Sequence, residues 1–471
     1  MSRSVWSRLL LWLFVGLAWL AAALAEAQGV KPSEAQVKKP PMQSPAGNPA
    51  HSDVLAGSAQ QAAQEAGPPP KIAFAGPAED YLDAQLRVVQ CLESQLDPLA
   101  DTADAAAARL QAGGRILLAG EHGMILELTG RAGGLCAAKP VPPGKNASPP
   151  GTSDVVLLSD FGITRQPTID FWTPLVQSDA LVVAFTSAEN PRLKQPLPGH
   201  VRPVPLAIQL DSRLIAQPNG QRLIPTASPA VAAAQWAFVA ELIGACRRQN
   251  RQLAVYLSFF LDPDRQRYKR TAGLLFEPDL RPDPVARKHY AGQFLATVRG
   301  SLEAVRREEI PQIRKAAGWL AEASAARVQV VRNLTGHLPP AEIGAPGDVD
   351  FFTNLKSNRP KWPEGEAWIR QNIHSGDVYL LLGYQENEDT MAAAAHERGA
   401  RTIFITSRGP GAEQRKDPRH VYVDPHWPYT DACLELPGYD VKACPISGIM
   451  GLSCYYAICG EAVERMTHLG K

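Results

Sequence analysis

The sequence contains the same order of elements twice, and this repetition constrains the fold more than any other feature. In each copy a helical stretch is interrupted by a proline, Pro98 or Pro311, resumes, and then enters a short apolar strand. Each strand leads to the pattern H-x-x-x-x-E-[LI], at residues 122–128 and again at 337–343. Self-similarity over such a distance indicates a chain built from two related units.

Two further matches follow in the same order. The segment SDALVVAFTSAEN at residues 178–190 is similar to GDVYLLLGYQEN at residues 376–387. Further on, each copy has a long apolar helical segment with a single acidic residue, Glu241 in the first and Glu461 in the second. We therefore expect the two halves to fold alike.

The strands of both halves are short and nearly all apolar, as in DVYLLLG and RTIFITS. Such strands are typical of parallel sheets that are covered on both faces. The sequence therefore predicts an α/β protein with two tandem three-layer αβα domains and mainly parallel sheets. We expect the domains at residues 71–262 and 284–471, joined by a Pro- and Asp-rich linker at 263–283.

The N-terminus predicts export. A basic start precedes an apolar run, and Ala23-Leu24-Ala25 fits the small-residue cleavage pattern of a signal peptide at residues 1–25. An uncleaved anchor is the alternative, although the run is short for a membrane span. Residues 26–70 are rich in Ala, Gln, Pro and Ser, and we expect a disordered linker there. The predicted location is the periplasm or the exterior of the cell.

Composition excludes some partners. The 48 basic and 47 acidic residues nearly balance, so nothing favours nucleic acid, and no further segment predicts a membrane span. We expect no cofactor and no metal, because His420, Asp424 and His426 lack an evident fourth ligand. Of the seven cysteines, Cys433 and Cys444 are the first pair to test for a disulfide.

Two segments resemble tandem SIS (sugar isomerase) domain proteins. GEHGMILELTGRAGG, which begins at Gly120, is similar to the glycine-histidine turn and following helix of a phosphosugar-binding group in that family. The segment SGDVYLLLGYQENEDTMAAAAHERGARTIFITS, which begins at Ser375, resembles the strand, phosphate turn and helix of the family. The resemblance implies a phosphosugar-binding fold, a carbohydrate-derivative ligand and a homodimer.

The phosphate turns depart from the family pattern, which reads roughly Ser-x-Ser-Gly-x-Ser/Thr. The second copy has GYQENED at residues 383–389, where three carboxylates replace the hydroxyls. A like-charge contact at about 4 Å costs about 1 to 4 kcal/mol, so this turn is a poor phosphate site. The first copy keeps Thr186, Ser187 and Asn190 and is the better candidate.

Isomerisation of a sugar phosphate needs a carboxylate base and an acid-base residue that is often His. The candidate catalytic residues are His122, Glu121 and Glu241. The ligand-binding candidates are Gly120, His122, Thr186, Ser187, Asn190 and His337, because turns after parallel strands commonly hold ligands. Each also has a structural interpretation, such as a helix cap or turn hydroxyl. Arg131 is either a ligand or dimer contact or part of an exposed helix face.

Three functions remain open from the sequence. The favoured one is an exported SIS-fold protein that binds a sugar or sugar-phosphate-like ligand without turnover. The second is a sugar-phosphate isomerase or related lyase, so whether the chain is an enzyme stays open. The third is a structural scaffold without a ligand.

Overall fold

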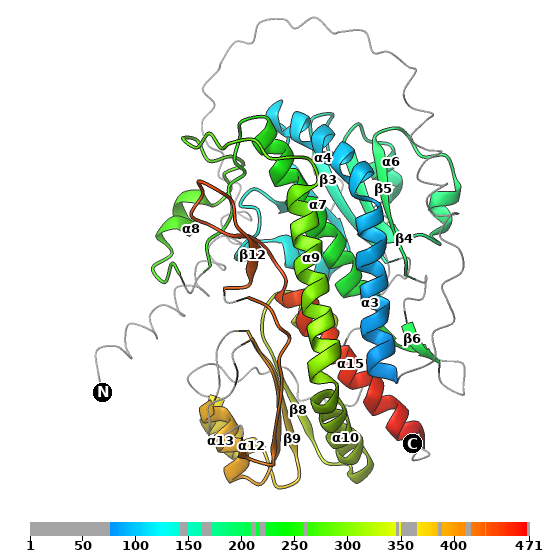
Figure 1. Ribbon diagram of the computed structural model, residues 1–471, viewed down its shortest axis with the longest axis vertical. Coiled ribbons are helices and arrows are strands. Elements are labelled where there is room, and N and C mark those ends of the chain that lie inside the picture. The colour runs from blue at the N-terminus through cyan, green and yellow to red at the C-terminus, as the bar shows by residue number, and fades with distance from the viewer. Residues whose placement is uncertain are drawn as a thin grey trace, which may run out of the picture. The chain divides into compact units, whose positions relative to one another are not determined.

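Two parallel β-sheets form the framework of the chain (Figure 1). The computed structural model describes residues 76–141, 149–161, 172–208, 213–216, 222–258, 261–344, 348–349, 365–384, 389–407, 409, 416–428 and 430–468. The expected signal segment at 1–25 and the linker at 26–70 lie outside the described residues.

The first sheet has the strand order β2-β1-β3-β4-β5, and every pairing in it is parallel. Its strands are β1 (Ile116–Gly120), β2 (Lys139–Pro140), β3 (Val155–Asp160), β4 (Leu181–Ser187) and β5 (Val201–Leu206). The second sheet has the order β11-β10-β9-β8 and is also parallel. Its strands are β8 (Val330–Leu334), β9 (Val378–Leu382), β10 (Arg401–Ile405) and β11 (His420–Val423). Two small antiparallel pairs complete the strands: β6 (Arg213–Ala216) with β7 (Arg222–Pro225), and β12 (Ala432–Leu434) with β13 (Ala443–Pro445).

Helices cover both faces of each sheet. They are α3 (Pro77–Ser94), α4 (Leu96–Gln111), α5 (His122–Leu128), α6 (Trp172–Val176), α7 (Ala227–Arg248), α8 (Gln266–Thr271), α9 (His289–Ala304), α10 (Ile310–Ala326), α11 (Leu338–Glu342), α12 (Gly365–Asn372), α13 (Asp389–Glu397) and α15 (Ser447–His468). Short 3-10 and π turns occupy Pro191–Lys194 and Val305–Glu309.

Alternate residues of the strands pack into different hydrophobic clusters. In β1, Ile116 and Leu118 join the large central cluster, whereas Leu117 packs with residues of α6 on the other face. In the second sheet Tyr379 and Phe404 pack with α12 and α13, which lie on the side of the sheet opposite α10 (Figure 1). Because both faces are buried, most positions of the strands are apolar, with exceptions such as Arg332 and Asn333 in β8. The predicted α/β fold class with mainly parallel sheets is confirmed.

The two predicted helix interruptions are also present. The break near Pro98 falls at Gln95, between α3 and α4, and places Pro98 in the first turn of α4. Pro311 lies in the first turn of α10, directly after the π turn Val305–Glu309. Proline is tolerated in the first turn of α4 because its missing N–H would have no partner within that helix. At Pro311 the chain stays helical from α9 through the π segment into α10, so this interruption is a π segment and not a break.

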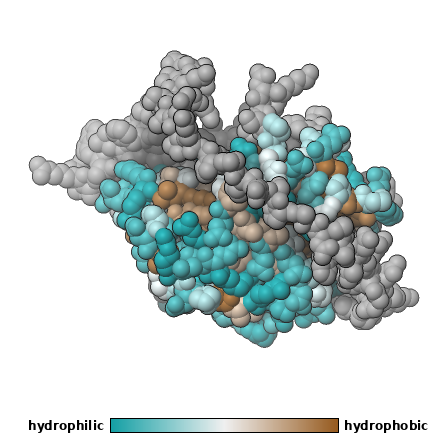
Figure 2. Space-filling view, turned by 90° about the horizontal axis from the view of Figure 1, so that it is seen from above, coloured by the Kyte–Doolittle hydropathy of each residue, from teal (hydrophilic) through white to brown (hydrophobic). Residues whose placement is uncertain are grey.

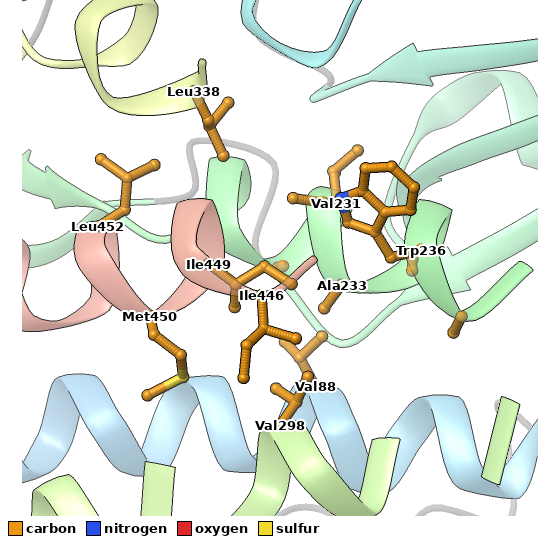
Figure 3. Close-up of a cluster of buried hydrophobic side chains, with 14 of the residues drawn as sticks. Val88, Val231, Ala233, Trp236, Val298, Leu338, Ile446, Ile449, Met450 and Leu452 are labelled. Atoms are coloured by element: carbon orange, nitrogen blue, oxygen red, sulfur yellow. The ribbon is translucent and has the colours of Figure 1, made fainter. Parts of the chain in front are cut away.

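The central cluster contains side chains from both halves of the sequence. Figure 3 shows Val88 of α3 and Val298 of α9 near Ile446 and Ile449 of the second half, and Trp236 next to Val231 of α7. The helix pairs α10–α15, α7–α9, α4–α7 and α3–α15 pack against one another. All described residues fall within one compact unit, Gly57–Lys471, and the division at 262 and 284 stays a prediction. The expected linker contains α8, and Phe276 in it packs against the central cluster.

The strands of the first half correspond to those of the second half in a different way from the one that the sequence predicted. β9 pairs with β8 as β3 pairs with β1, each beside the first strand of its sheet. An aspartate before each strand, Asp154 or Asp377, accepts the backbone N–H of the residue before the first strand at 2.9 and 3.1 Å, respectively. The expected match of residues 178–190 with 376–387 is therefore wrong by one strand. The counterpart of β9 in the first half is β3.

One described helix, α7, is long and apolar enough to cross a membrane, and all of that apolar stretch is buried inside the protein. Figure 2 shows mainly hydrophilic residues on the coloured part of the upper surface, with small apolar areas between them.

Candidate functional site

Polar groups gather at the carboxyl edge of the first sheet. The chain reverses direction across the sheet between β1 and β3, because β2 pairs on one side of β1 and β3 on the other. Ligands of open α/β sheets commonly bind outside the carboxyl ends of the strands at such a point. The backbone N–H of Glu121, after β1, donates to Ser159 Oγ at 3.1 Å.

Gly120 allows this close approach of the two strands. Its φ of +101° lies in the left-handed region, and a β-carbon there would lie 1.9 Å from the carbonyl oxygen of Ser159. Any side chain at this position would push β1 away from β3. Gly120 therefore shapes the turn through its backbone.

A hydrogen-bonded polar group, which we call the edge cluster, comprises Asp160, Trp172, Thr186 and Asn190. The side-chain amide of Asn190 donates to Asp160 Oδ2 at 3.0 Å and to Thr186 Oγ1 at 2.8 Å. The indole N–H of Trp172 donates to the same carboxylate. The edge cluster thus joins the ends of β3 and β4.

A cation lies beside the edge cluster. The guanidinium carbon of Arg192 is 5.4 Å from the ring centroid of Trp172. The backbone N–H of Arg192 donates to Asn190 Oδ1 at 3.1 Å, which starts the short 3-10 turn. Trp172, Thr186 and Asn190 are buried, Asp160 is half-buried and Arg192 is exposed, so the two charged groups lie at the more accessible margin of the cluster.

The other predicted residues of the first copy separate into two groups. His122 is the first residue of α5 and is exposed, and Glu121 beside it is half-buried. The hydroxyl of Ser187 instead donates to the Ile208 carbonyl at 2.5 Å, so Ser187 holds the chain after β5. The structure brings Gly120, Glu121 and His122 to the edge of β1 and places Thr186 and Asn190 in the edge cluster.

Glu241 has a structural environment. It is fully buried in α7, where it pairs with Arg248 at 3.0 Å and accepts the backbone N–H of Lys288, before α9, at 3.0 Å. Glu461 in α15 similarly accepts the N–H of Ala78 at the start of α3, at 3.3 Å. Each glutamate therefore holds the first helix of the other half.

His337 lies at the contact between α5 and α11, near Arg131. Burial, assisted by the Arg131 charge, lowers its pKa to about 4, so the imidazole is neutral at pH 7. Arg131 itself is buried, with 3% of its surface exposed, so of the alternatives for this residue the exposed helix face is wrong. Its guanidinium contacts Glu127 of the first half and Asp431 of the second.

The other candidates are placed as follows. The imidazole of His420 lies 2.6 Å from Thr402 Oγ1, and Asp424 accepts the N–H of His426 at 2.7 Å. No cluster of three metal-ligating side chains occurs among the residues that the structure describes. All seven cysteines are free, including Cys433, whose sulfur is 3.2 Å from the carbonyl oxygen of Cys444. Residues 385–388 of the acidic turn lie outside the described residues.

The equivalence of β3 and β9 shows which signal the sequence interpretation missed. The last two residues of β3 and the four that follow read Ser-Asp-Phe-Gly-Ile-Thr at residues 159–164. It agrees with the family's phosphate-turn pattern at Ser159, Gly162 and Thr164 and differs at Phe161. Residues 162–171 lie outside the described residues. The segment DVVLLSD at 154–160 is identical to DVYLLLG at 377–383 at four positions, whereas the comparison with 178–190 relied on the Glu-Asn that closes both segments and so favoured the wrong strand.

Comparisons with known proteins concern the fold. No protein-family model and no curated protein sequence matches the chain. Among solved structures, the C-terminal domain of glucosamine-fructose-6-phosphate aminotransferase from Francisella tularensis matches with a TM-score of 0.40 and 10% identity, over 83% of this chain and 98% of that one. A protein assigned as sugar-binding from Salmonella typhimurium LT2 gives 0.37 and 9%, over 82% and 98%. One assigned as a phosphosugar isomerase from Silicibacter pomeroyi DSS-3 gives 0.35 and 13%, also over 82% and 98%. Each of these names describes the protein that carries it.

Proposed function

We propose that this chain is an exported tandem-repeat protein that binds a carbohydrate derivative at the carboxyl edge of its first sheet, without turnover. The observation that carries the proposal is the edge cluster, which joins two strands beside the point where the chain reverses direction. Carboxylate, amide and indole groups at such an edge can each form hydrogen bonds to sugar hydroxyls.

The chemistry of the candidate acid-base residues supports binding without turnover. Isomerisation requires a base within reach of a sugar carbon. Glu241 is engaged with Arg248 and the N–H of Lys288, and His337 is half-buried at the contact between α5 and α11. Only Glu121 and His122 remain at the edge of β1, so a complete pair of catalytic groups would have to come from these neighbours.

A thermal-shift screen with neutral sugars, amino sugars and sugar phosphates tests binding. A ligand present at about a hundred times its Kd stabilises the folded state by about 2.7 kcal/mol. Asp160→Ala should lose this shift for the same ligand, because it removes the oxygen that accepts from both the Trp172 indole and the Asn190 amide. Glu464→Gln, an exposed change on α15, serves as the control that should keep it. A screen without any saturable shift would reject the proposal.

Turnover is tested separately, by incubating the protein with hexose phosphates. We expect no interconversion of aldose and ketose. Steady conversion that His122→Ala abolishes would establish the isomerase instead.

Export and assembly are tested on the full chain. N-terminal sequencing of secreted protein should begin near Glu26 if the signal segment is cleaved, and at Met1 if it remains as an anchor. Light scattering should give the mass of a homodimer.

A further inference from the structure

Asp431 is the most heavily hydrogen-bonded carboxylate that we find in the second half. It is fully buried and accepts hydrogen bonds from at least five donors. Its Oδ1 accepts the backbone N–H groups of Ile446 and Ser447 at 2.9 and 2.6 Å. Its Oδ2 accepts from Arg131 Nη2 at 2.5 Å and from the hydroxyls of Tyr384 and Ser447, each at 2.8 Å.

These donors come from distant parts of the chain. Arg131 follows α5 in the first half, Tyr384 follows β9, and Ile446 and Ser447 begin the 22-residue helix α15. Amides at a helix N-terminus, a guanidinium and hydroxyls together form the donor set that proteins present to bound oxyanions. A side chain that only caps a helix typically accepts from one or two backbone N–H groups. The donor set here exceeds what a cap requires.

The surroundings of Arg131 point to the same conclusion. Its guanidinium also donates to Glu127 and to Ser447 Oγ, the latter at 2.9 Å, while its Nε has no hydrogen-bond partner among the described residues. Ser447 thus accepts from Arg131 and donates to Asp431, which gives its single proton a defined direction. The cation is therefore fixed in place beside the anion position.

The backbone that delivers Asp431 is strained. Thr430 and Asp431 have φ values of +71° and +72°, a region that residues other than glycine rarely adopt. Strain of this kind persists only where surrounding contacts impose it. Here those contacts are the five hydrogen bonds to the carboxylate.

We propose that Asp431 is a built-in anion, which permanently fills a complete oxyanion-binding site in the second half. The site would accept a small oxyanion such as formate if the carboxylate were removed. With the carboxylate present, the second half takes no external anion. The number of ligands bound rests on the proposed function: the chain then binds a single ligand, in its first half.

Asp431→Ala tests the proposal without any sugar. The substitution leaves the donors in place and opens space for a carboxylate-sized ion. We expect a lower thermal unfolding midpoint than that of the wild type, and a saturable rise with sodium formate that sodium chloride of equal ionic strength does not reproduce. The wild-type protein should respond equally to the two salts.

Asp154→Ala is the matched control. Asp154 is also a buried carboxylate that accepts backbone N–H groups and pairs with an arginine, but the side chain of Arg115 is 53% exposed. Its loss should lower the midpoint without rescue by formate. Equal responses of Asp431→Ala to formate and chloride, or equal rescue of both variants, would overturn the proposal.

If Asp431→Ala does not fold in buffer, refolding provides the second measurement. The denatured variant is diluted into formate or chloride of equal ionic strength, and recovery of the folded circular dichroism signal is followed. Recovery in formate alone supports the built-in anion. Equal recovery in both salts, or recovery in neither, contradicts it.

Discussion

The carboxylate of Glu342 lies against the α-carbon of Gly123, so that a β-carbon at Gly123 would lie 2.0 Å from Glu342 Oε1. Gly123 belongs to α5 and Glu342 to α11, the short helices that follow the first strand of each sheet. Glu342 also accepts a hydrogen bond from Ser228 at the start of α7. In the same way, Glu127 of α5 approaches Gly448 at the start of α15, where a β-carbon would lie 2.9 Å from its oxygens. Each of these two glutamates therefore contacts the start of the long apolar helix in the other half, Glu342 at α7 and Glu127 at α15.

Gly123→Ala should destabilise the protein. The new methyl group must displace the buried carboxylate of Glu342 and break its bond to Ser228, at a cost of about 1 to 3 kcal/mol. Chemical denaturation would measure the loss. Gly300→Ala is the control, because a β-carbon at this α9 position meets nothing within 4 Å. It should leave stability unchanged or raise it by up to about 1 kcal/mol, and similar losses for both variants would contradict the explanation.

Glu241→Ala should impair folding stability and leave ligand affinity unchanged. The change removes the acceptor for Lys288 N–H and one partner of Arg248, which keeps Asp104 at 2.7 Å. Breaking a buried ion pair costs about 3 to 5 kcal/mol. Because Arg248 keeps Asp104 as a partner, we expect a loss at the lower end of this range. Denaturation and ligand titration on the same preparation separate the two effects. A weaker ligand affinity with unchanged stability would show that Glu241 belongs to the ligand site.

Thr186→Val and Ser187→Ala should act differently although the residues are neighbours. Thr186 accepts the Asn190 amide in the edge cluster, whereas Ser187 donates to the Ile208 carbonyl. We expect Thr186→Val to weaken ligand binding up to about tenfold, the equivalent of one hydrogen bond. Ser187→Ala should cost about 1 kcal/mol of stability and leave affinity intact. Titration of the ligand found by the thermal-shift screen decides, and equal affinities of the two variants would count against the edge cluster.

Acid should destabilise the protein partly through His420. The pKa of His420 is lowered to about 4 from its ordinary 6.5, mainly by burial and secondly by the charge of the nearby His396. The folded state holds the imidazole neutral. The stabilisation that this gives the folded state is therefore complete above pH 6.5 and is lost as the pH falls toward 4. A shift of this size corresponds to about 3 kcal/mol. The free energy of unfolding, measured from pH 7 to 4, should fall less steeply in His420→Phe than in the wild type.

The control for this pH dependence is His374→Phe, since the His374 side chain is 61% exposed. It should retain the wild-type slope. A wild-type slope in His420→Phe would show that the acid sensitivity arises elsewhere.

The sequence by itself determined the elements and their class. Apolar runs such as those of β4 and β9 predicted strands buried on both faces, and Pro98 and Pro311 marked the helix interruptions, because these signals depend only on neighbours along the chain. Gly120 was identified as a ligand-turn candidate, and the structure places it at the close approach of β1 to β3.

The tertiary structure decided which charged residues meet. Arg131 and Asp431 are 300 residues apart in the sequence, and nothing near either one predicts that both are buried together. Glu241 looked like a candidate base until its partners, contributed by Arg248 and the loop before α9, were in place. Strand order likewise separated β3 from β4 as the counterpart of β9. Burial and ion pairing depend on groups that folding brings together from distant parts of the chain. The residues that neighbour each group in the sequence therefore do not predict its burial or its ion-pair partner.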